Sequence, residues 1–149
     1  MVYFTIEEAN MGFLQNMKEK LDNMDLPIFT ASAQYLGGHK DITKQCDINV
    51  VGYKDRIELQ QGLKKAIIKV DGILRAEVKS EEQIEKDVTL TRLLLVGIFA
   101  FGLKKKRKIE SNFAIITFQD GLECCVILKL DKVDQANKLI SNVVKLKSS

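Results

Sequence analysis

The sequence of 149 residues has little of the chemistry that most catalytic and metal sites require, since it contains one histidine and three cysteines. A catalytic histidine needs a nucleophile and an orienting acid nearby. His39, in the turn Gly37-Gly38-His39-Lys40, has no neighbouring serine or cysteine, so we expect a solvent-exposed turn residue. A structural zinc site needs about four ligands at short paired spacings, and the histidine and cysteines show no such spacing.

The cysteines Cys46, Cys124 and Cys125 also lack the number and spacing of a disulfide framework. Cys124 and Cys125 are neighbours in a predicted strand, so their side chains should point to opposite faces. We expect free, buried or half-buried thiols, as in a reducing cytosol. The chain starts without a basic segment and carries Glu7 and Glu8 early, which predicts no signal peptide and a cytoplasmic location.

Glycine-rich phosphate loops are absent too, because neither GxGxxG nor GxxxxGK occurs. The acidic residues from Glu81 to Asp87 lie among lysines, a pattern typical of a solvated surface. The formal net charge of +3 is too small to indicate binding to nucleic acid. With 46% hydrophobic and 29% charged residues the composition is that of one folded domain. We therefore expect no enzyme, no cofactor or metal site and no nucleic acid partner.

Long hydrophobic runs are also missing. The uncharged stretch 93–103 has 11 residues, whereas a helix that spans a membrane needs about 20. Apolar alternation over residues 88–96, followed by Gly97 and Gly102, predicts a strand buried on both faces and then a bend at a barrel corner.

A basic run follows this segment. It consists of Lys104, Lys105, Lys106, Arg107 and Lys108. Basic clusters attract anionic lipid, so this run is a candidate contact for an anionic ligand or a membrane surface. The alternative is a hydrated turn that keeps a hydrophobic hairpin in solution.

The first element that the sequence predicts is an amphipathic helix. Apolar residues recur at helical spacing until Pro27 ends the element. Ile6, Phe13 and Met17 share one face of this helix. We expect the face to pack along the outside of the domain that follows. The alternative is the groove of a partner, which makes these three residues a candidate partner-helix face.

From Ile28 the hydrophobic period changes to two, which predicts about seven short strands in one domain. The pairs Asp71-Gly72 and Asp120-Gly121 both predict hairpins. The second pair joins two clearly alternating apolar runs and is typical of a type I′ turn. The acidic segment 79–87 has little strand character and predicts a loop or a short helical turn.

A second amphipathic helix ends the sequence. Asp131 stands where an N-cap residue belongs. The apolar face consists of Val133, Ala136, Leu139, Ile140, Val143, Val144 and Leu146. We expect this face to pack on the preceding sheet.

This order of strands and helix, with the stretch "RLLLVGIFAFGLKKKRK" and the hairpin after it, resembles the pleckstrin-homology-like (PH-like) barrels common in Gram-positive bacteria and their prophages. The resemblance covers about residues 28–146 and is closest from Arg92 onward. It implies an α+β, mainly β fold of about seven antiparallel strands in two orthogonal sheets, closed by the C-terminal amphipathic helix. Residues 1–26 are then an N-terminal helical extension and residues 27–149 the barrel domain.

The same resemblance implies a non-catalytic binding module that acts through protein–protein interaction. Two alternatives remain open. One is a small inhibitor of a host enzyme or defence system, encoded by a phage or mobile element. The other is a peripheral binder of anionic membranes through the basic run, although the loop after the first strand has only Lys40 and Lys44 as strong bases. A second copy of the chain is a further partner, paired through the first helix or an exposed sheet edge.

Overall fold

The computed structural model of the chain describes residues 6–87 and 112–149. Its helices are α1 (Ile6–Asn23), α2 (Glu81–Lys86) and α4 (Val133–Ser148). Its strands are β1 (Phe29–Gly37), β2 (Cys46–Gly52), β3 (Arg56–Gln61), β4 (Lys64–Lys69), β5 (Ile73–Ser80), β6 (Asn112–Asp120) and β7 (Leu122–Leu130). The predicted mainly β fold, with one helix before the strands and one after them, is confirmed.

All seven strands form one antiparallel sheet in the order β4-β3-β2-β1-β7-β6-β5. β1 is its central strand, and the two sides of β1 are paired over different lengths. It pairs with β2 from Phe29 to Tyr35 but with β7 only from Gln34 to Gly37. No ladder joins β4 to β5 in the described part of the chain, so the sheet is open at these two edges.

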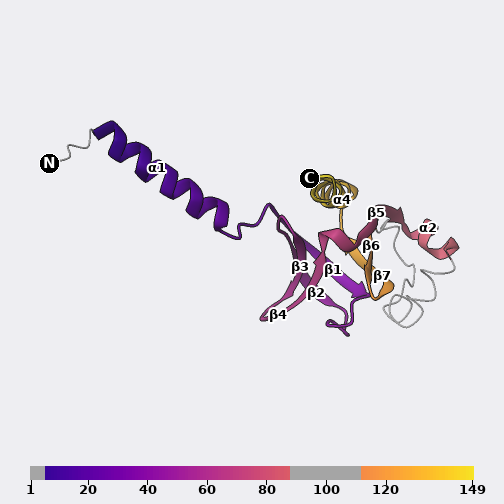
Figure 1. Cartoon of the computed structure of the whole chain (residues 1–149). Helices are drawn as coiled ribbons and strands as arrows, with labels where there is room; N and C mark the ends of the chain where they lie inside the picture. Colours follow the sequence, from indigo (N-terminus) through magenta and orange to yellow (C-terminus); the bar gives the residue numbers. More distant parts are fainter. Residues whose placement is uncertain (1–5, 88–111) are drawn as a thin grey trace.

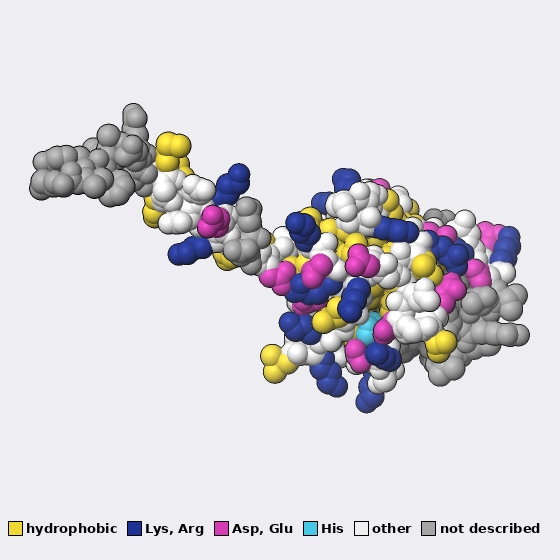
Figure 2. Space-filling view, in the orientation of Figure 1, with side chains coloured by type: hydrophobic (Ala, Val, Ile, Leu, Met, Phe, Trp, Pro, Cys, Tyr) yellow, Lys and Arg dark blue, Asp and Glu magenta, His cyan; other side chains and the backbone are white. Residues whose placement is uncertain are grey.

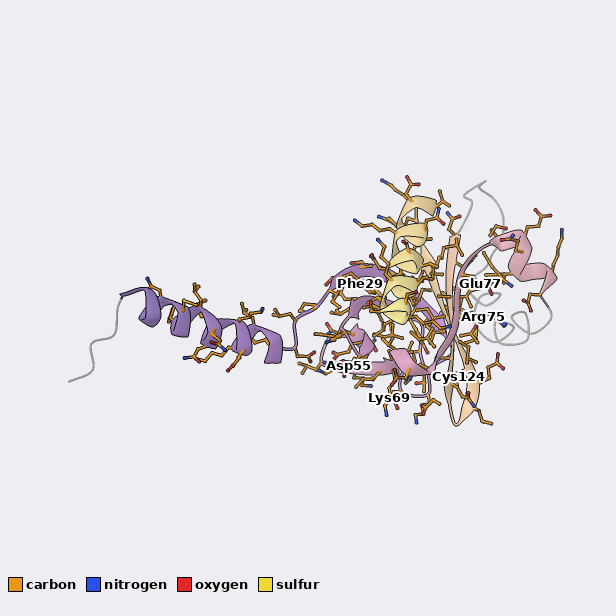
Figure 3. All side chains as sticks on the ribbon, turned by 45° about the horizontal axis from the view of Figure 1, so that its top comes forward. Phe29, Asp55, Lys69, Arg75, Glu77 and Cys124 are labelled. Carbon is orange, nitrogen blue, oxygen red and sulfur yellow. The ribbon has the colours of Figure 1, made fainter. Side chains whose placement is uncertain are left out.

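α4 lies across one face of this sheet and covers the main core (Figure 1). Side chains of β1, β2, β6 and β7 converge beneath it (Figure 3), and the half-buried ring of Phe29 packs at the margin of this core. The buried residues of α4 are Ala136, Leu139, Ile140, Val143 and Leu146. Val133 and Val144 were predicted on the same face but are 49% and 45% exposed.

The start of α4 differs from the prediction. The N-cap residue is Lys132 rather than Asp131, and no side-chain hydrogen bond caps the helix. Asp134 lies in the first turn, where its negative charge complements the positive end of the helix dipole. Packing of the apolar face, which begins at Ala136, therefore determines where this helix lies.

The opposite face of β6 and β7 is buried as well. A second apolar cluster consists of Leu36, Ile84, Phe113, Ile115 and Ile127. Ile84 belongs to α2, the short helical turn predicted for the acidic segment, which begins at a capping box between Ser80 and Gln83. Cys124 packs against the main core and Cys125 against this second cluster, so the two side chains point to opposite faces as predicted.

The hairpin at Asp120-Gly121 is confirmed, since β6 and β7 pair along their whole lengths. The predicted type I′ turn is wrong, however. Such a turn needs a positive φ at both central residues, and in this turn only Gly121, with φ of 74°, has one. The last paired residues before the turn are Asp120 and Leu122, so Gly121 is the single unpaired residue at the tip of the hairpin.

The predicted hairpin at Asp71-Gly72 is also wrong. A 3-10 turn, Val70–Gly72, leads from β4 to β5, and these strands lie at opposite edges of the sheet. The Asp-Gly pair does lie in a turn, but the strand after the turn does not pair with the strand before it. β5 pairs with β6 instead of β4. The strand predicted over residues 88–96 and the bend at Gly97 and Gly102 lie outside the described residues.

Truncation of Ile140 tests whether α4 holds the core together. Ile140 is 8% exposed in the core, so Ile140→Ala should lower the free energy of unfolding by about 2–5 kcal/mol. Lys138 is exposed on the same helix, and Lys138→Ala should change it by no more than about 0.5 kcal/mol. Urea denaturation of both variants measures the difference. Equal midpoints for the two would show that α4 is not the cover of the core.

Candidate functional site

α1 points away from the sheet, with its N-terminal end farthest from it (Figure 1). The expected packing of this helix on the domain is therefore wrong. Of the predicted partner-helix face, Phe13 is 63% and Met17 is 43% exposed, while the side chain of Ile6 lies outside those described. Leu14 and Leu21 are also exposed, at 62% and 51%. Figure 2 shows apolar side chains of this helix open to solvent.

Arg56 of β3 holds the segment that joins α1 to the sheet. Its guanidinium forms an ion pair with Asp25 through Nη2 and donates a second hydrogen bond from Nη1 to Asp25 Oδ1 at 3.2 Å. Nη1 also donates to Asp55 Oδ1 at 2.9 Å, and Nε donates to Glu58 Oε2 at 2.7 Å. The guanidinium lies over the ring of Tyr53 at 4.2 Å, a favourable cation–π geometry. Figure 3 labels Asp55 at this junction.

Glu58 is the buried member of this network, with 3% of its side chain exposed. Burial alone would raise the pKa of its carboxyl, but hydrogen bonds from Arg56 and Gln60, together with the charge of Lys65, hold the pKa below the ordinary value of 4.5. The hydrogen bond from Arg56 likewise lowers the pKa of Asp25. A buried carboxylate without a partner is strongly destabilising, so Arg56 serves both the core and the linker.

A polar groove of about 460 Å³ runs along the outer side of β1 and β2 towards the start of α4. Ser32, Asn49 and Gln60 stand side by side on three adjacent strands. Ser32 Oγ donates to Asn49 Oδ1 at 3.2 Å. An amide oxygen cannot take the proton of a hydroxyl as a general base does, so this row has hydrogen-bonding capacity but no activated nucleophile. The groove offers hydrogen-bond donors and acceptors that suit a polar ligand.

His39 is buried, with 5% exposed, so the expected exposed histidine is wrong. Its Nδ1 accepts from the Asp41 N–H at 3.1 Å, which leaves Nε2–H to donate to the Ile67 carbonyl oxygen at 3.0 Å. The ring stacks on Phe118 with centroids 5.7 Å apart. The Tyr35 hydroxyl accepts from the His39 N–H at 2.7 Å. These contacts connect edge strand β4 to β6, with no ligand position left open.

The other groups that could bind a metal or react as nucleophiles are the cysteines and carboxylates of the described residues. Within residues 6–87 and 112–149, no group of three or more His, Cys, Asp or Glu side chains could hold a metal ion. The three cysteines are free, and burial raises the pKa of Cys46 and Cys125. A raised pKa keeps a thiol protonated and therefore weakly nucleophilic at neutral pH.

The uncharged stretch 93–103, the first candidate membrane feature, lies outside the described residues. Among the described residues, no helix combines the length and the apolar character needed to cross a bilayer. The basic run Lys104–Lys108 lies outside the described residues. The apolar side of α1 is the most exposed apolar surface on a helix in the described part of the chain. The periodicity of the sequence predicted which residues lie on this side, and the tertiary structure shows that no other element of the described part covers them.

The Glu58 network predicts a specific pH dependence of stability. Because its pKa in the folded protein lies below 4.5, the unfolded chain takes up this proton first as the pH falls. Its stabilising contribution is complete above pH 4.5 and is lost as the pH drops through the folded pKa. The difference in unfolding free energy between the wild type and Glu58→Gln should therefore be largest at neutral pH and shrink in acid. A difference that stays constant down to acid pH would contradict this assignment.

Replacement of His39 should show that the ring is structural. His39→Ala leaves the Ile67 carbonyl and the Asp41 N–H without their partner, at a cost of about 1–3 kcal/mol in the free energy of unfolding. Lys44, exposed in the same loop, provides the control, and Lys44→Ala should change stability by no more than about 0.5 kcal/mol. Thermal and urea unfolding measure both. Matching stabilities for the two variants would mean that the buried contacts of His39 contribute nothing.

The chain matches no protein-family model, and a comparison with curated proteins finds no match either. Its function must therefore be inferred from its own surfaces. The described part of the chain offers a polar groove without an activated nucleophile and an exposed apolar helix on an anchored linker.

Proposed function

We propose that this protein is a non-catalytic binding module that acts through protein–protein contact, with the apolar side of α1 as its contact surface. The exposure of this side carries the proposal. Phe13, Leu14, Met17 and Leu21 have 43–63% of their surfaces in contact with solvent. We call these four residues the α1 face.

The α1 face needs a cover for the helix to be stable. α1 has 18 residues, and an isolated helix of this length is marginal in water because most helical stability in proteins comes from packing. Gly12 lies in its interior and weakens it by about 1 kcal/mol relative to alanine. A partner that covers the α1 face supplies the missing packing, as in complexes where an amphipathic helix lies in a hydrophobic groove.

The attachment of α1 supports a presenting role. Arg56 binds Asp25 in the linker, and the Ile28 N–H donates to the Gly52 carbonyl oxygen at 2.6 Å. The chain that leaves α1 is therefore held at one place on the sheet. Such an anchor reduces the conformational freedom that a partner must remove on binding.

We also propose that the sheet and α4 form a PH-like fold. Support comes from the strand order, in which β1 pairs with β2 on one side and with β7 on the other, and from the single helix that follows β7 and covers the core. Domains of this architecture serve many functions, so the fold itself does not name a partner. α1 precedes this unit and lies outside the proposed PH-like fold.

Site-specific crosslinking in the host cell tests the proposed contact surface. A photo-reactive residue in place of Met17, on the α1 face, should form covalent adducts with a protein. The same group in place of Gln15, on the other side of the helix by its period of 3.6 residues, should form few. Mass spectrometry of the adducts identifies the partner, whether another protein or a second copy.

A second substitution, Phe13→Ser, is then added to the variant that carries the photo-reactive residue at position 17. It removes apolar area from the α1 face and leaves the residues of the sheet unchanged. It should reduce the yield of adducts, while Leu122→Ser, which changes an exposed apolar residue at the β6–β7 tip, should not. Equal adducts from positions 15 and 17, or adducts unaffected by Phe13→Ser, would show that the α1 face is not the contact surface.

A further inference from the structure

We infer that the open edge of β1 beside α4 binds an extended segment of a partner protein that carries an acidic side chain. This site is separate from the α1 face, so it goes beyond the function proposed above and does not depend on it. The two ladders of β1 differ in extent. The strand pairs with β2 from Phe29 to Tyr35, whereas its pairing with β7 begins only at Gln34. The backbone from Phe29 to Ala33 therefore has a neighbouring strand on one side only.

The hairpin between β2 and β3 determines which main-chain groups of β1 face this open side. The Tyr53 N–H donates to the Arg56 carbonyl oxygen at 2.8 Å, in register with the ladder of β2 and β3. Successive residues of a strand direct their main-chain groups to alternate sides, so the even-numbered residues of β2 direct theirs to β1. These residues pair with odd-numbered residues of β1. The N–H and C=O groups of Thr30 and Ser32 therefore point away from β2.

These groups have no backbone partner in the described part of the chain. β7 ends at Leu130, and the chain then turns into α4. The segment before β1 leaves on the opposite side, where the Ile28 N–H donates to the Gly52 carbonyl oxygen. Unpaired main-chain groups along a strand edge are a template for another strand. Thr30 and Ser32 together offer two donors and two acceptors to such a strand.

The open edge borders a pocket of about 290 Å³ between residues 30–32 and one side of α4. α4 contributes Gln135, Lys138 and Asn142 to its lining. Ser32 and Gln135 also line the polar groove of the outer sheet face, so the two hollows adjoin there. Figure 3 labels Phe29, at the start of β1, close to α4. A strand added to β1 would lie about 4.8 Å from it, on the side where this pocket opens.

The lining of the pocket indicates the chemistry of its occupant. Main-chain donors and acceptors repeated along a line fit an extended peptide, as in complexes where a peptide adds a strand to a sheet. Among the described residues that line the pocket, Lys138 is the only charged one. It is exposed and forms no ion pair with another residue of the described part. An acidic side chain of the segment would pair with it.

Peptide selection on the full chain tests the site. The probe is a displayed library of short random linear peptides, and the selected peptides should carry an acidic residue and bind with micromolar dissociation constants because the contact is small. Hydrogen exchange followed by NMR should show rapid exchange of the Thr30 and Ser32 N–H groups, slowed by the peptide. The Ala31 N–H, directed to β2, should exchange slowly throughout. Slow exchange at Thr30 and Ser32 without peptide would mean that the edge is already covered, by a second copy for example, and would overturn the inference.

Two pairs of variants separate main-chain from side-chain recognition. Thr30→Pro removes an N–H that faces the pocket and no hydrogen bond to β2, so it should raise the dissociation constant of a selected peptide at least about tenfold. Thr30→Ala keeps this N–H and should change the constant little. Lys138→Glu should also weaken binding, whereas Lys145→Glu, the same charge change on α4 outside the pocket, should not. Urea unfolding checks that each variant is folded.

Methylation of the peptide's own N–H groups, one at a time, tests the pairing without any change in the protein. Binding should weaken at alternate positions only, because alternate residues of a strand face its neighbour. Loss at no position, or equal affinity of Thr30→Pro and Thr30→Ala, would overturn strand pairing. Leu14→Glu with Met17→Glu should leave peptide binding unchanged. Loss of binding in that variant would place the peptide on the α1 face, which would support the proposed function and overturn this second site.

Discussion

The contact between α4 and one face of the sheet is the interaction on which the rest of the molecule depends. The described strands form an open ladder with no closing pair between β4 and β5, so their apolar face needs a cover. Five side chains of α4 provide it. The outer side of β1 and β2 carries polar residues such as Ser32 and Asn49, and the outer side of β6 is buried in the second cluster. Within the described residues, neither of these two outer sides leaves α1 an uncovered apolar surface to pack against.

Two buried polar groups tie distant segments to this core. His39 accepts from one backbone N–H and donates to the carbonyl of Ile67, so its ring connects the loop after β1 to edge strand β4. Glu58 accepts from Arg56, whose guanidinium reaches the linker after α1. In each case one contact joins partners far apart in the sequence, His39 with Ile67 and Arg56 with Asp25. Buried polar groups are tolerated because they are hydrogen-bonded, and each of these fixes one loop or linker.

The features of α1 combine into a consistent account of how this chain would recognise a partner. A helix with an uncovered apolar side gains its stability when that side is buried. Ordering of α1 and binding would then be parts of one equilibrium, and the cost of ordering lowers the affinity obtained per unit of buried area. The anchor at Arg56 limits that cost to the helix itself. The proposed contact would then form and dissociate readily, on a domain whose core stays intact.

Features that depend on interactions between residues close in the sequence were predicted correctly more often than features that depend on distant residues. Periodicity by itself determined the type of most elements: α1, the strands, the turn of α2 and the face of α4 that packs from Ala136 to Leu146. These depend on residues within a few positions of one another, so local side-chain spacing is sufficient. The turn at Asp71-Gly72 and the one at Asp120-Gly121 carry the same pair, yet only the second joins adjacent strands.

What the tertiary structure alone decided are the features that need partners from elsewhere in the chain. The burial of His39 depends on Ile67 and Phe118, and the anchoring of the linker after α1 depends on the ion pair of Arg56 with Asp25. The exposure of the α1 face depends on which surfaces the sheet leaves apolar. A sequence pattern indicates that a side chain will be stabilised by an apolar or a charged neighbour. The order of the strands determines which residue is that neighbour, and contacts between residues far apart in the chain determine the order of the strands.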